Sequence, residues 1–374
     1  MIHGRHLSDQ AAQIDALDGI RGLAVLYVLA AHLSQVRLNL IPGLDLSHMG
    51  QAGVYLFFTL SAFLLMMGFL RQGAQSLEWR HLVYYAIRRV LRIAPLYILF
   101  LPIAYAEVYR LRQGEMPRID TGKMLQALTL QRADGVNWSV VVEVKFYVIL
   151  PLIAACCLLL FGKRTVAAAV MLIALAVGVA IMVPLPARGT APIIALWPYL
   201  PPFLPGCAAA IVFHRAGAHP PEARAARLAR GAAVVIGIVA LVLAPLIASM
   251  LAVSDSPERA VGRWVFSWSV LWAALIVTAL LGGKWPRRLF EMSWLRRVGQ
   301  LSFSSYLVHA YMITAVPLGL AAVGLGYPLL EAWATVAVTF AIAEIMFRSI
   351  ERPFARSRWA ARMLGIGPAR NVTG

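Results

Sequence analysis

The sequence predicts an all-α integral membrane protein, a bundle of about ten transmembrane helices with both termini in the cytoplasm. Of its 374 residues, 60% are hydrophobic and only 14% are charged, whereas soluble domains average about 25% charged residues. The apolar residues also fall in blocks of about 20, the length that one helical crossing of a bilayer requires. These two observations exclude a typical soluble enzyme.

Ten apolar segments predict the helices. In chain order they cover approximately residues 20–36, 50–70, 90–109, 138–161, 165–185, 192–213, 231–252, 262–281, 299–323 and 327–347. We expect a cytoplasmic segment at 1–19, a membrane domain at 20–350 and a basic cytoplasmic tail at 351–374. No small-residue cleavage site follows the first block, so we interpret it as a retained helix rather than a signal peptide.

The charge distribution predicts the orientation. The 34 Lys and Arg residues against 17 Asp and Glu residues give a net charge of +17, which in a soluble protein would suggest binding to nucleic acid. With a cytoplasmic N-terminus, 23 of the basic residues fall in inner segments and nine in outer loops, while Arg21 and Lys145 lie at or within helices. Because Lys and Arg hold loops on the cytoplasmic side, the excess predicts topology and contact with membrane lipids, and no nucleic-acid partner.

The first span carries two ionisable residues, which are costly in a bilayer and are therefore candidate site residues. Arg21 and His32 are eleven residues apart, so they share one helix face within about 20° and lie about 16 Å apart along the axis. With the N-terminus inside, Arg21 lies at the cytoplasmic mouth and His32 deep in the outer half. The alternatives are a topology anchor for Arg21 and a packing role for His32.

The next two spans begin with distinct patterns. Gly50 and Gly53 supply small residues for close helix packing at the start of the second. Arg88, Arg89 and Arg92 open the third, with Arg89 and Arg92 on one face. Guanidinium groups match the geometry of phosphate oxygens, so this face is a candidate phosphate site. The alternatives are a topology signal or contact with lipid headgroups.

The fourth span begins at Trp138 and Ser139 and carries Glu143. If Trp138 marks the membrane interface, Glu143 lies about 8 Å below it, a depth similar to that of His32. A carboxylate and an imidazole at one depth can orient each other, provided that packing brings them together. The alternative is an ion pair of Glu143 with Lys145 or another cation, although residues i and i+2 point to different helix faces.

The later spans contain fewer polar residues. Cys156, Cys157 and Cys207 lie inside apolar spans without metal-ligand spacing, so neither a disulfide framework nor a metal site is predicted. Motifs of dinucleotide-binding folds, P-loop ATPases and zincins are absent from the sequence. His309 in the ninth span is more typical of a polar packing residue than of a catalyst, and Glu351 after the tenth is typical of a helix terminator with a solvated ion pair.

Six segments in order resemble the membrane acyltransferase-3 family over nearly the whole chain. Ala62 stands where the family usually has Gly, and Val144 and Lys145 replace the more usual Glu and Gln. The matching segments are Leu17–Ala24 followed by His32, Gly53–Leu64, Arg89–Tyr97, Trp138–Tyr147, Ser304–His309 and Glu351–Phe354.

The resemblance implies an integral membrane enzyme of the bacterial inner membrane. Such an enzyme takes an acyl group, commonly acetyl, from cytoplasmic acyl-CoA and places it on a hydroxyl of a glycan or lipid-linked saccharide, without a metal. O-acetylation of polysaccharides is a typical outcome. Some members carry an additional periplasmic hydrolase-like domain, and we expect the form without it.

The resemblance and the spacing together assign roles. Arg21, Arg89 and Arg92 are expected to bind the phosphates of CoA, His32 to act as general base and Glu143 to orient it. An acyl-His32 intermediate is the alternative route. Donors to the oxyanion are expected among Trp138, Ser139 and His309. The rival functions are acylation of a small molecule such as a macrolide, and a proton-coupled transporter or flippase.

Overall fold

The structure of the chain is a computed structural model. It describes residues 2–47, 49–104, 120–133, 135–162, 164–182, 194–218, 223–239, 264–282, 284–357 and 359–365. Within these ranges the regular structure is entirely helical and contains no strand. The predicted all-α class is confirmed.

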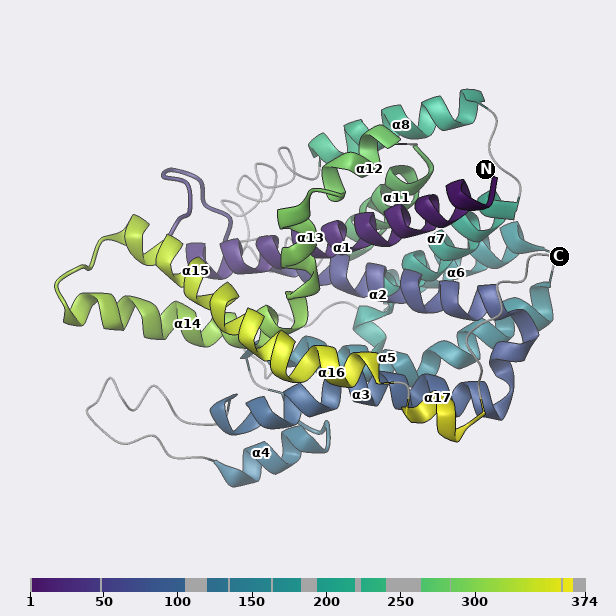
Figure 1. The fold of residues 1–374 in the computed structure, drawn as a ribbon. Helices are drawn as coiled ribbons and strands as arrows, with labels where there is room; N and C mark the ends of the chain where they lie inside the picture. Colours follow the sequence, from purple (N-terminus) through teal and green to yellow (C-terminus); the bar gives the residue numbers. More distant parts are fainter. Residues whose placement is uncertain are drawn as a thin grey trace.

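Among the described residues, nine long helices form the body of the structure (Figure 1). They are α1 (Ile2–Gln35), α2 (Gly50–Gln72), α3 (Trp79–Ala104), α5 (Trp138–Ala155), α6 (Thr165–Met182), α7 (Leu200–Ala218), α11 (Val265–Leu281), α14 (Ser302–Ala322) and α15 (Pro328–Met346). The shorter helices among the described residues are α4 (Thr121–Leu128), α8 (Ala223–Ile238), α12 (Lys284–Phe290), α13 (Ser293–Gln300), α16 (Arg352–Arg356) and α17 (Trp359–Met363).

Six helical segments of the described chain are long and apolar enough to cross a membrane, which supports a multi-pass membrane protein. They are Asp15–Gln35, Gly50–Leu77, Gly135–Phe161, Thr165–Met182, Ser302–Ala322 and Pro328–Met363. The other four predicted spans fall in α3, α7, α8 and α11, of which α11 is an apolar helix of 17 residues. Much of the predicted span 231–252 and the end of the span 90–109 lie outside the described residues. The count of about ten stays a prediction.

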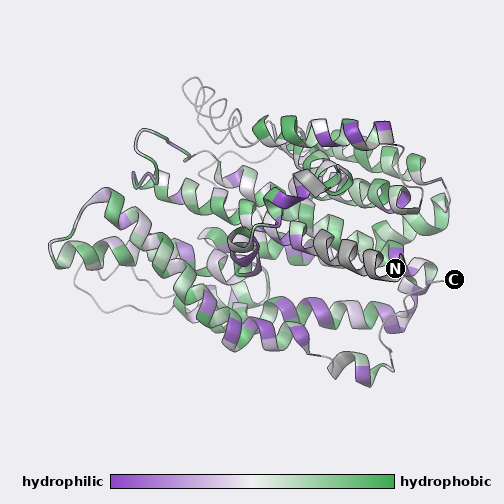
Figure 2. Cartoon of the chain, turned by 45° about the horizontal axis from the view of Figure 1, so that its top comes forward, coloured by the Kyte–Doolittle hydropathy of each residue, from purple (hydrophilic) through white to green (hydrophobic). Residues whose placement is uncertain are grey.

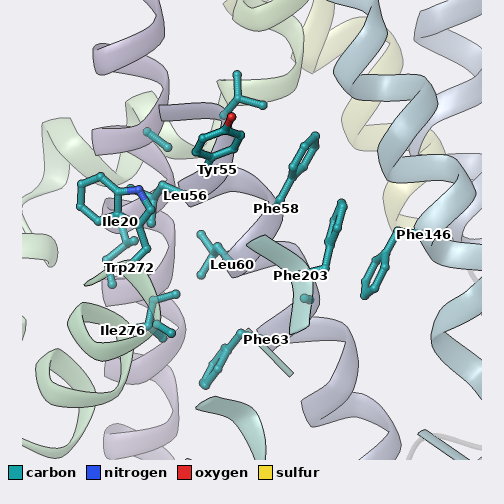
Figure 3. Close-up of a cluster of buried hydrophobic side chains, with 14 of the residues drawn as sticks. Ile20, Tyr55, Leu56, Phe58, Leu60, Phe63, Phe146, Phe203, Trp272 and Ile276 are labelled. Atoms are coloured by element: carbon teal, nitrogen blue, oxygen red, sulfur yellow. The ribbon is translucent and has the colours of Figure 1, made fainter. Parts of the chain in front are cut away.

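Aromatic side chains fill the centre of the bundle, where α2, α5, α7 and α11 meet (Figure 3). The ring of Phe203 stacks on Phe146 with 3.9 Å between centroids and on Phe58 with 4.5 Å. The indole of Trp272 donates a hydrogen bond of 2.9 Å to the carbonyl of Ala52. Hydrophobic residues predominate along most of the long helices (Figure 2), and many large hydrophobic side chains are exposed on the surface of the described structure.

Glycines allow α1 to approach its neighbours closely. A Cβ atom on Gly53 of α2 would lie 2.8 Å from the carbonyl oxygen of Ala24, and one on Gly299 of α13 would lie 1.7 Å from that of Asp18. The predicted close packing at Gly53 is therefore confirmed. The segment 284–297, expected between two spans on the inner side, forms α12 and most of α13, and α13 packs against α1. These contacts support the part of α1 that carries Arg21.

Both described ends of the chain lie at the same end of the bundle, where α1 begins and α17 ends (Figure 1). The connection between α14 and α15 lies at the opposite end. The cytoplasmic location of this end stays a prediction, since no membrane is present in the structure.

Candidate active site

A cavity lies between α1, α2, α3, α5 and α14. Four of the predicted site residues line it: Arg21, Arg92, Ser139 and Glu143. The other lining residues are Val54, Phe57, Phe58, Ser61, Ile93, Val140, Tyr147, Ser302, Phe303 and Tyr306. The cavity therefore contains two guanidinium groups and one carboxylate. Its hydroxyl groups form a polar wall and belong to Ser61, Ser139, Tyr147, Ser302 and Tyr306.

The charged part of this cavity lies inside the bundle. Ser61, which also lines it, is eleven residues from each end of α2, so about 16 Å of helix extends on either side of it. Arg21 therefore lies near the middle of α2. The sequence had instead predicted a position at the mouth of the bundle. The prediction assumed that α1 starts where its apolar run starts, whereas α1 begins at Ile2 and runs along α2 before it reaches Arg21.

Trp138 packs against aromatic side chains from other parts of the chain. The 3₁₀ turn Gly135–Asn137 that precedes it already has Val136 and Asn137 buried. The indole packs against Tyr199 at 4.8 Å and against Phe58 at 6.0 Å between ring centroids. Glu143 lines the same cavity as Arg21, whereas His32 does not line it. The depth of Glu143 in the membrane stays a prediction.

Two hydroxyl groups hold the carboxylate of Glu143. Ser61 on α2 and Tyr147 on α5 both donate to its Oε1, the latter at 2.7 Å. Oε2 thus keeps its capacity to accept hydrogen bonds from a bound molecule. Neither predicted partner is found: Lys145 donates to the carbonyl of Ile194 at 2.7 Å, and His32 pairs with another side chain.

A second carboxylate faces the two arginines of the cavity. Glu351 is only 6% exposed, accepts a hydrogen bond of 2.7 Å from Ser304 and interacts electrostatically with Arg92 and Arg21. The prediction of a solvated ion pair at Glu351, after the last span, is therefore wrong. The sequence contained no sign of this, because Ser304 is 47 residues away and belongs to another helix.

The two arginines differ in how they are held. Arg21 donates to Asp18 at 2.9 Å, one turn earlier on α1. Within the described part of the chain, Arg92 makes no hydrogen bond. Its guanidinium is thus available to a ligand in the cavity.

Arg89 lies next to the cavity without lining it. Its guanidinium lies over the rings of Tyr85 and Tyr147, at 5.9 and 5.7 Å from their centroids. Its Nε is buried without a hydrogen-bond partner among the described residues. Arg88, beside it, donates at 3.2 Å to the carbonyl of Ser357 near the C-terminal end of the described chain. Tyr147 therefore connects Arg89 to Glu143.

His32 and His309 form a pair beyond the polar wall of the cavity. Nε2 of His309 lies 3.3 Å from Nδ1 of His32, with the ring centroids 5.0 Å apart. The ring of Tyr306, which lines the cavity, lies 5.4 Å from that of His309. Tyr306 donates to the carbonyl of Val136 at 2.9 Å and accepts from Ser139 at 2.7 Å. Tyr306 thus separates the charged cavity from the histidines.

Backbone carbonyls favour one tautomer of each ring in the neutral pair. Nδ1 of His32 lies 2.8 Å from the carbonyl of Val28, and Nδ1 of His309 lies 2.7 Å from that of Tyr306. A carbonyl oxygen only accepts, so each Nδ1 carries a proton. The lone pair is therefore on Nε2 in both rings. Neutral His309 then has no N–H left for an oxyanion, which counts against its expected role as an oxyanion donor.

Comparison with known families decides the identity. A sequence profile of the acyltransferase domain family matches residues 14–348. The chain belongs to the acyltransferase 3 family. The comparisons with curated proteins and with solved structures find no match.

Membership of the acyltransferase 3 family makes the chain an enzyme that transfers acyl groups, and the resemblance stated from its motifs is confirmed. It also argues against the rival hypothesis of a transporter or flippase. No group of three or more His, Cys, Asp or Glu side chains that could hold a metal ion occurs in the described ranges.

Five of the six acyltransferase 3 motif segments contribute residues to the cavity or the histidine pair. The sixth contributes Glu351, which interacts electrostatically with Arg92 and Arg21. The sequence did not identify Ser61, Tyr147, Tyr306 or Glu351 as site residues, although each lies within one of these segments.

Proposed function

We propose that this acyltransferase moves an acyl group, acetyl in the simplest case, from cytoplasmic acyl-CoA to a hydroxyl of a glycan or lipid-linked saccharide at the bacterial inner membrane. One observation carries the proposal. A cavity with two guanidinium groups, one of them without a hydrogen bond in the described chain, adjoins the His32–His309 pair across Tyr306.

The arginines suit the donor. A CoA nucleotide carries phosphates, and Arg89, Arg92 and Arg21 provide three cations whose planar guanidinium groups bind phosphate oxygens well. α1 is continuous from Arg21 to His32, a distance of about 16 Å along its axis. The long, slender pantetheine arm of CoA would bridge this distance and bring the thioester to the histidine.

His32 suits the role of general base. Its Nε2 takes the proton of the acceptor hydroxyl, and the hydroxyl oxygen attacks the thioester carbonyl carbon. The tetrahedral oxyanion collapses, the C–S bond breaks, and the leaving thiolate takes the proton from the His32 imidazolium. The products are the ester and free CoA thiol. An alternative route forms acyl-His32 first and passes the acyl group to the hydroxyl in a second step.

In this proposal Glu143 binds a substrate in the cavity and does not orient His32. Its Oε2 accepts a hydrogen bond from an N–H or O–H group of the bound substrates, while Ser61 and Tyr147 hold Oε1. Ser139 lines the cavity and remains the proposed oxyanion donor after rotation of its hydroxyl away from Tyr306. Trp138 packs behind it and supports the wall.

A transfer assay tests the proposal. The purified protein in lipid nanodiscs receives acetyl-CoA labelled in the acetyl group and a lipid-linked saccharide extract, and the labelled ester is measured. We expect transfer by the natural chain and a loss of at least about 100-fold in His32→Ala, the usual contribution of a general base. His214→Ala, a half-buried histidine on α7, is the matched control and should retain full activity.

Two results would refute parts of the proposal. Full transfer by folded His32→Ala protein would exclude both catalytic routes. Label on a macrolide but not on saccharide would replace the glycan acceptor by a small molecule. In cells, mass spectrometry of surface glycans with and without the gene should show the loss of one ester mass.

A further inference from the structure

The proposed mechanism leaves His309 without a task, although its side chain is buried to 2% exposure next to His32. Both ring nitrogens of His309 are engaged. Nδ1 lies 2.7 Å from the carbonyl oxygen of Tyr306 on its own helix, and Nε2 lies 3.3 Å from Nδ1 of His32 on α1. With Nδ1 bonded to a carbonyl, the remaining nitrogen of His309, Nε2, can accept a hydrogen bond from His32.

Hydrogen-bonding capacity determines the direction of that bond. The carbonyl of Tyr306 needs a proton on Nδ1 of His309, so Nε2 of neutral His309 carries only a lone pair. The facing Nδ1 of His32 must then be the donor. The carbonyl of Val28 requires the same proton, at 2.8 Å. One N–H of His32 is therefore shared between an acceptor on its own helix and an acceptor on α14.

We infer that His309 is a positioning residue that holds His32 in the tautomer protonated on Nδ1 and keeps its Nε2 as the basic nitrogen. The inference rests on the proposed function, because the tautomer matters for acyl transfer only if His32 is the base. The Val28 carbonyl belongs to α1 itself, whereas His309 restrains the ring from a second helix. When Nε2 of His32 takes a proton, the lone pair of His309 faces the resulting imidazolium and stabilises it.

The same geometry keeps His309 neutral. A proton on its Nε2 would place two N–H donors face to face at 3.3 Å, and a charge in this buried position would lose its hydration. The pair therefore takes up one proton, on Nε2 of His32.

Solid-state NMR reads the tautomer without any enzyme assay. Protein labelled with ¹⁵N-histidine is reconstituted in lipid, and the ring signals of His32 are assigned from their absence in His32→Ala. Protonated and unprotonated ring nitrogens have well separated ¹⁵N shifts. We expect Nδ1–H for His32 in the natural chain and in His309→Gln, whose amide oxygen can accept. In His309→Phe the Val28 carbonyl is the one remaining acceptor of the two, and we expect part of the His32 population to shift to the Nε2–H tautomer. His214→Phe is the control and should leave the His32 signals unchanged.

Kinetics of the same variants complete the test. Partners that orient a functional histidine at metal sites contribute about 10- to 100-fold to activity, and we expect a kcat loss of this order in His309→Phe. KM for acetyl-CoA should stay within about twofold, and His309→Gln should recover most of the loss.

The possible outcomes separate the two proposals. An Nε2–H tautomer in the natural chain, or unchanged His32 signals in His309→Phe, overturns the role of His309 even if acyl transfer is observed. A tautomer that depends on His309 supports this role even if the acyl donor or acceptor proves to be different.

Discussion

The hydroxyl of Tyr147 donates a hydrogen bond of 2.7 Å to Oε1 of Glu143, one helical turn away on α5. The guanidinium of Arg89 lies over the same ring, 5.7 Å from its centroid. Tyr147 thus connects a cation proposed to bind the donor with the carboxylate at the centre of the cavity. Neither connection depends on Lys145, which the sequence offered as a partner of Glu143.

Tyr147→Phe removes one of the two donors to Glu143 and keeps the ring. Hydrogen bonds to charged groups contribute about 1.5–3 kcal/mol, so we expect a lower apparent melting temperature in nanodiscs. Tyr84→Phe removes a hydroxyl that makes no hydrogen bond among the described residues and should change little. Equal melting temperatures for the two variants would show that Tyr147 does not hold Glu143.

Glu351→Leu should destabilise the protein strongly. Removal of one partner from a buried charge cluster leaves the others uncompensated and costs about 3–5 kcal/mol, here at Arg92 and Arg21. Denaturation monitored by tryptophan fluorescence measures the loss. Glu78→Leu, at a side chain 60% exposed, provides the comparison, and a similar stability of both variants would contradict the buried position of Glu351.

Arg92→Gln should weaken the binding of acetyl-CoA more than it slows the reaction. The loss of a charge-assisted bond of about 1.5–3 kcal/mol corresponds to an increase of about 10- to 100-fold in KM, with kcat largely retained. Arg288→Gln, an exposed arginine on α12, should leave KM unchanged. A fall in kcat alone would place Arg92 in the chemical step and not in donor binding.

Gly299→Ala and Gly206→Ala should disrupt helix packing. The new Cβ atoms would lie 1.7 Å from the carbonyl oxygen of Asp18 and 2.2 Å from that of Thr59, and backbone must move to admit them. Overpacking costs about 1–3 kcal/mol or more, which thermal unfolding would detect. Gly319→Ala on α14 has open space around its Cβ and should be neutral or slightly stabilising, because Ala favours helix over Gly.

Much of the fold was predictable because helix formation and membrane crossing are local properties. Six of the predicted spans correspond to apolar helices long enough to cross a bilayer, since length and hydropathy can be read within one segment. α3 was harder to predict as a span because its N-terminal half carries Arg80, Arg88, Arg89 and Arg92. The family was also readable, because its motifs are short and ordered along the chain.

The sequence by itself determined which residues are candidates for the chemistry: a few ionisable groups stand out in an apolar chain, and spacing places Arg21 and His32 on one helix face. Only the tertiary structure decided how they pair. It joins Glu143 to Ser61 and Tyr147, and His32 to His309. The reason is physical: a pairing between helices depends on their relative depth and rotation, and these follow from contacts between segments as distant as Asp18 and Gly299, which no local pattern records.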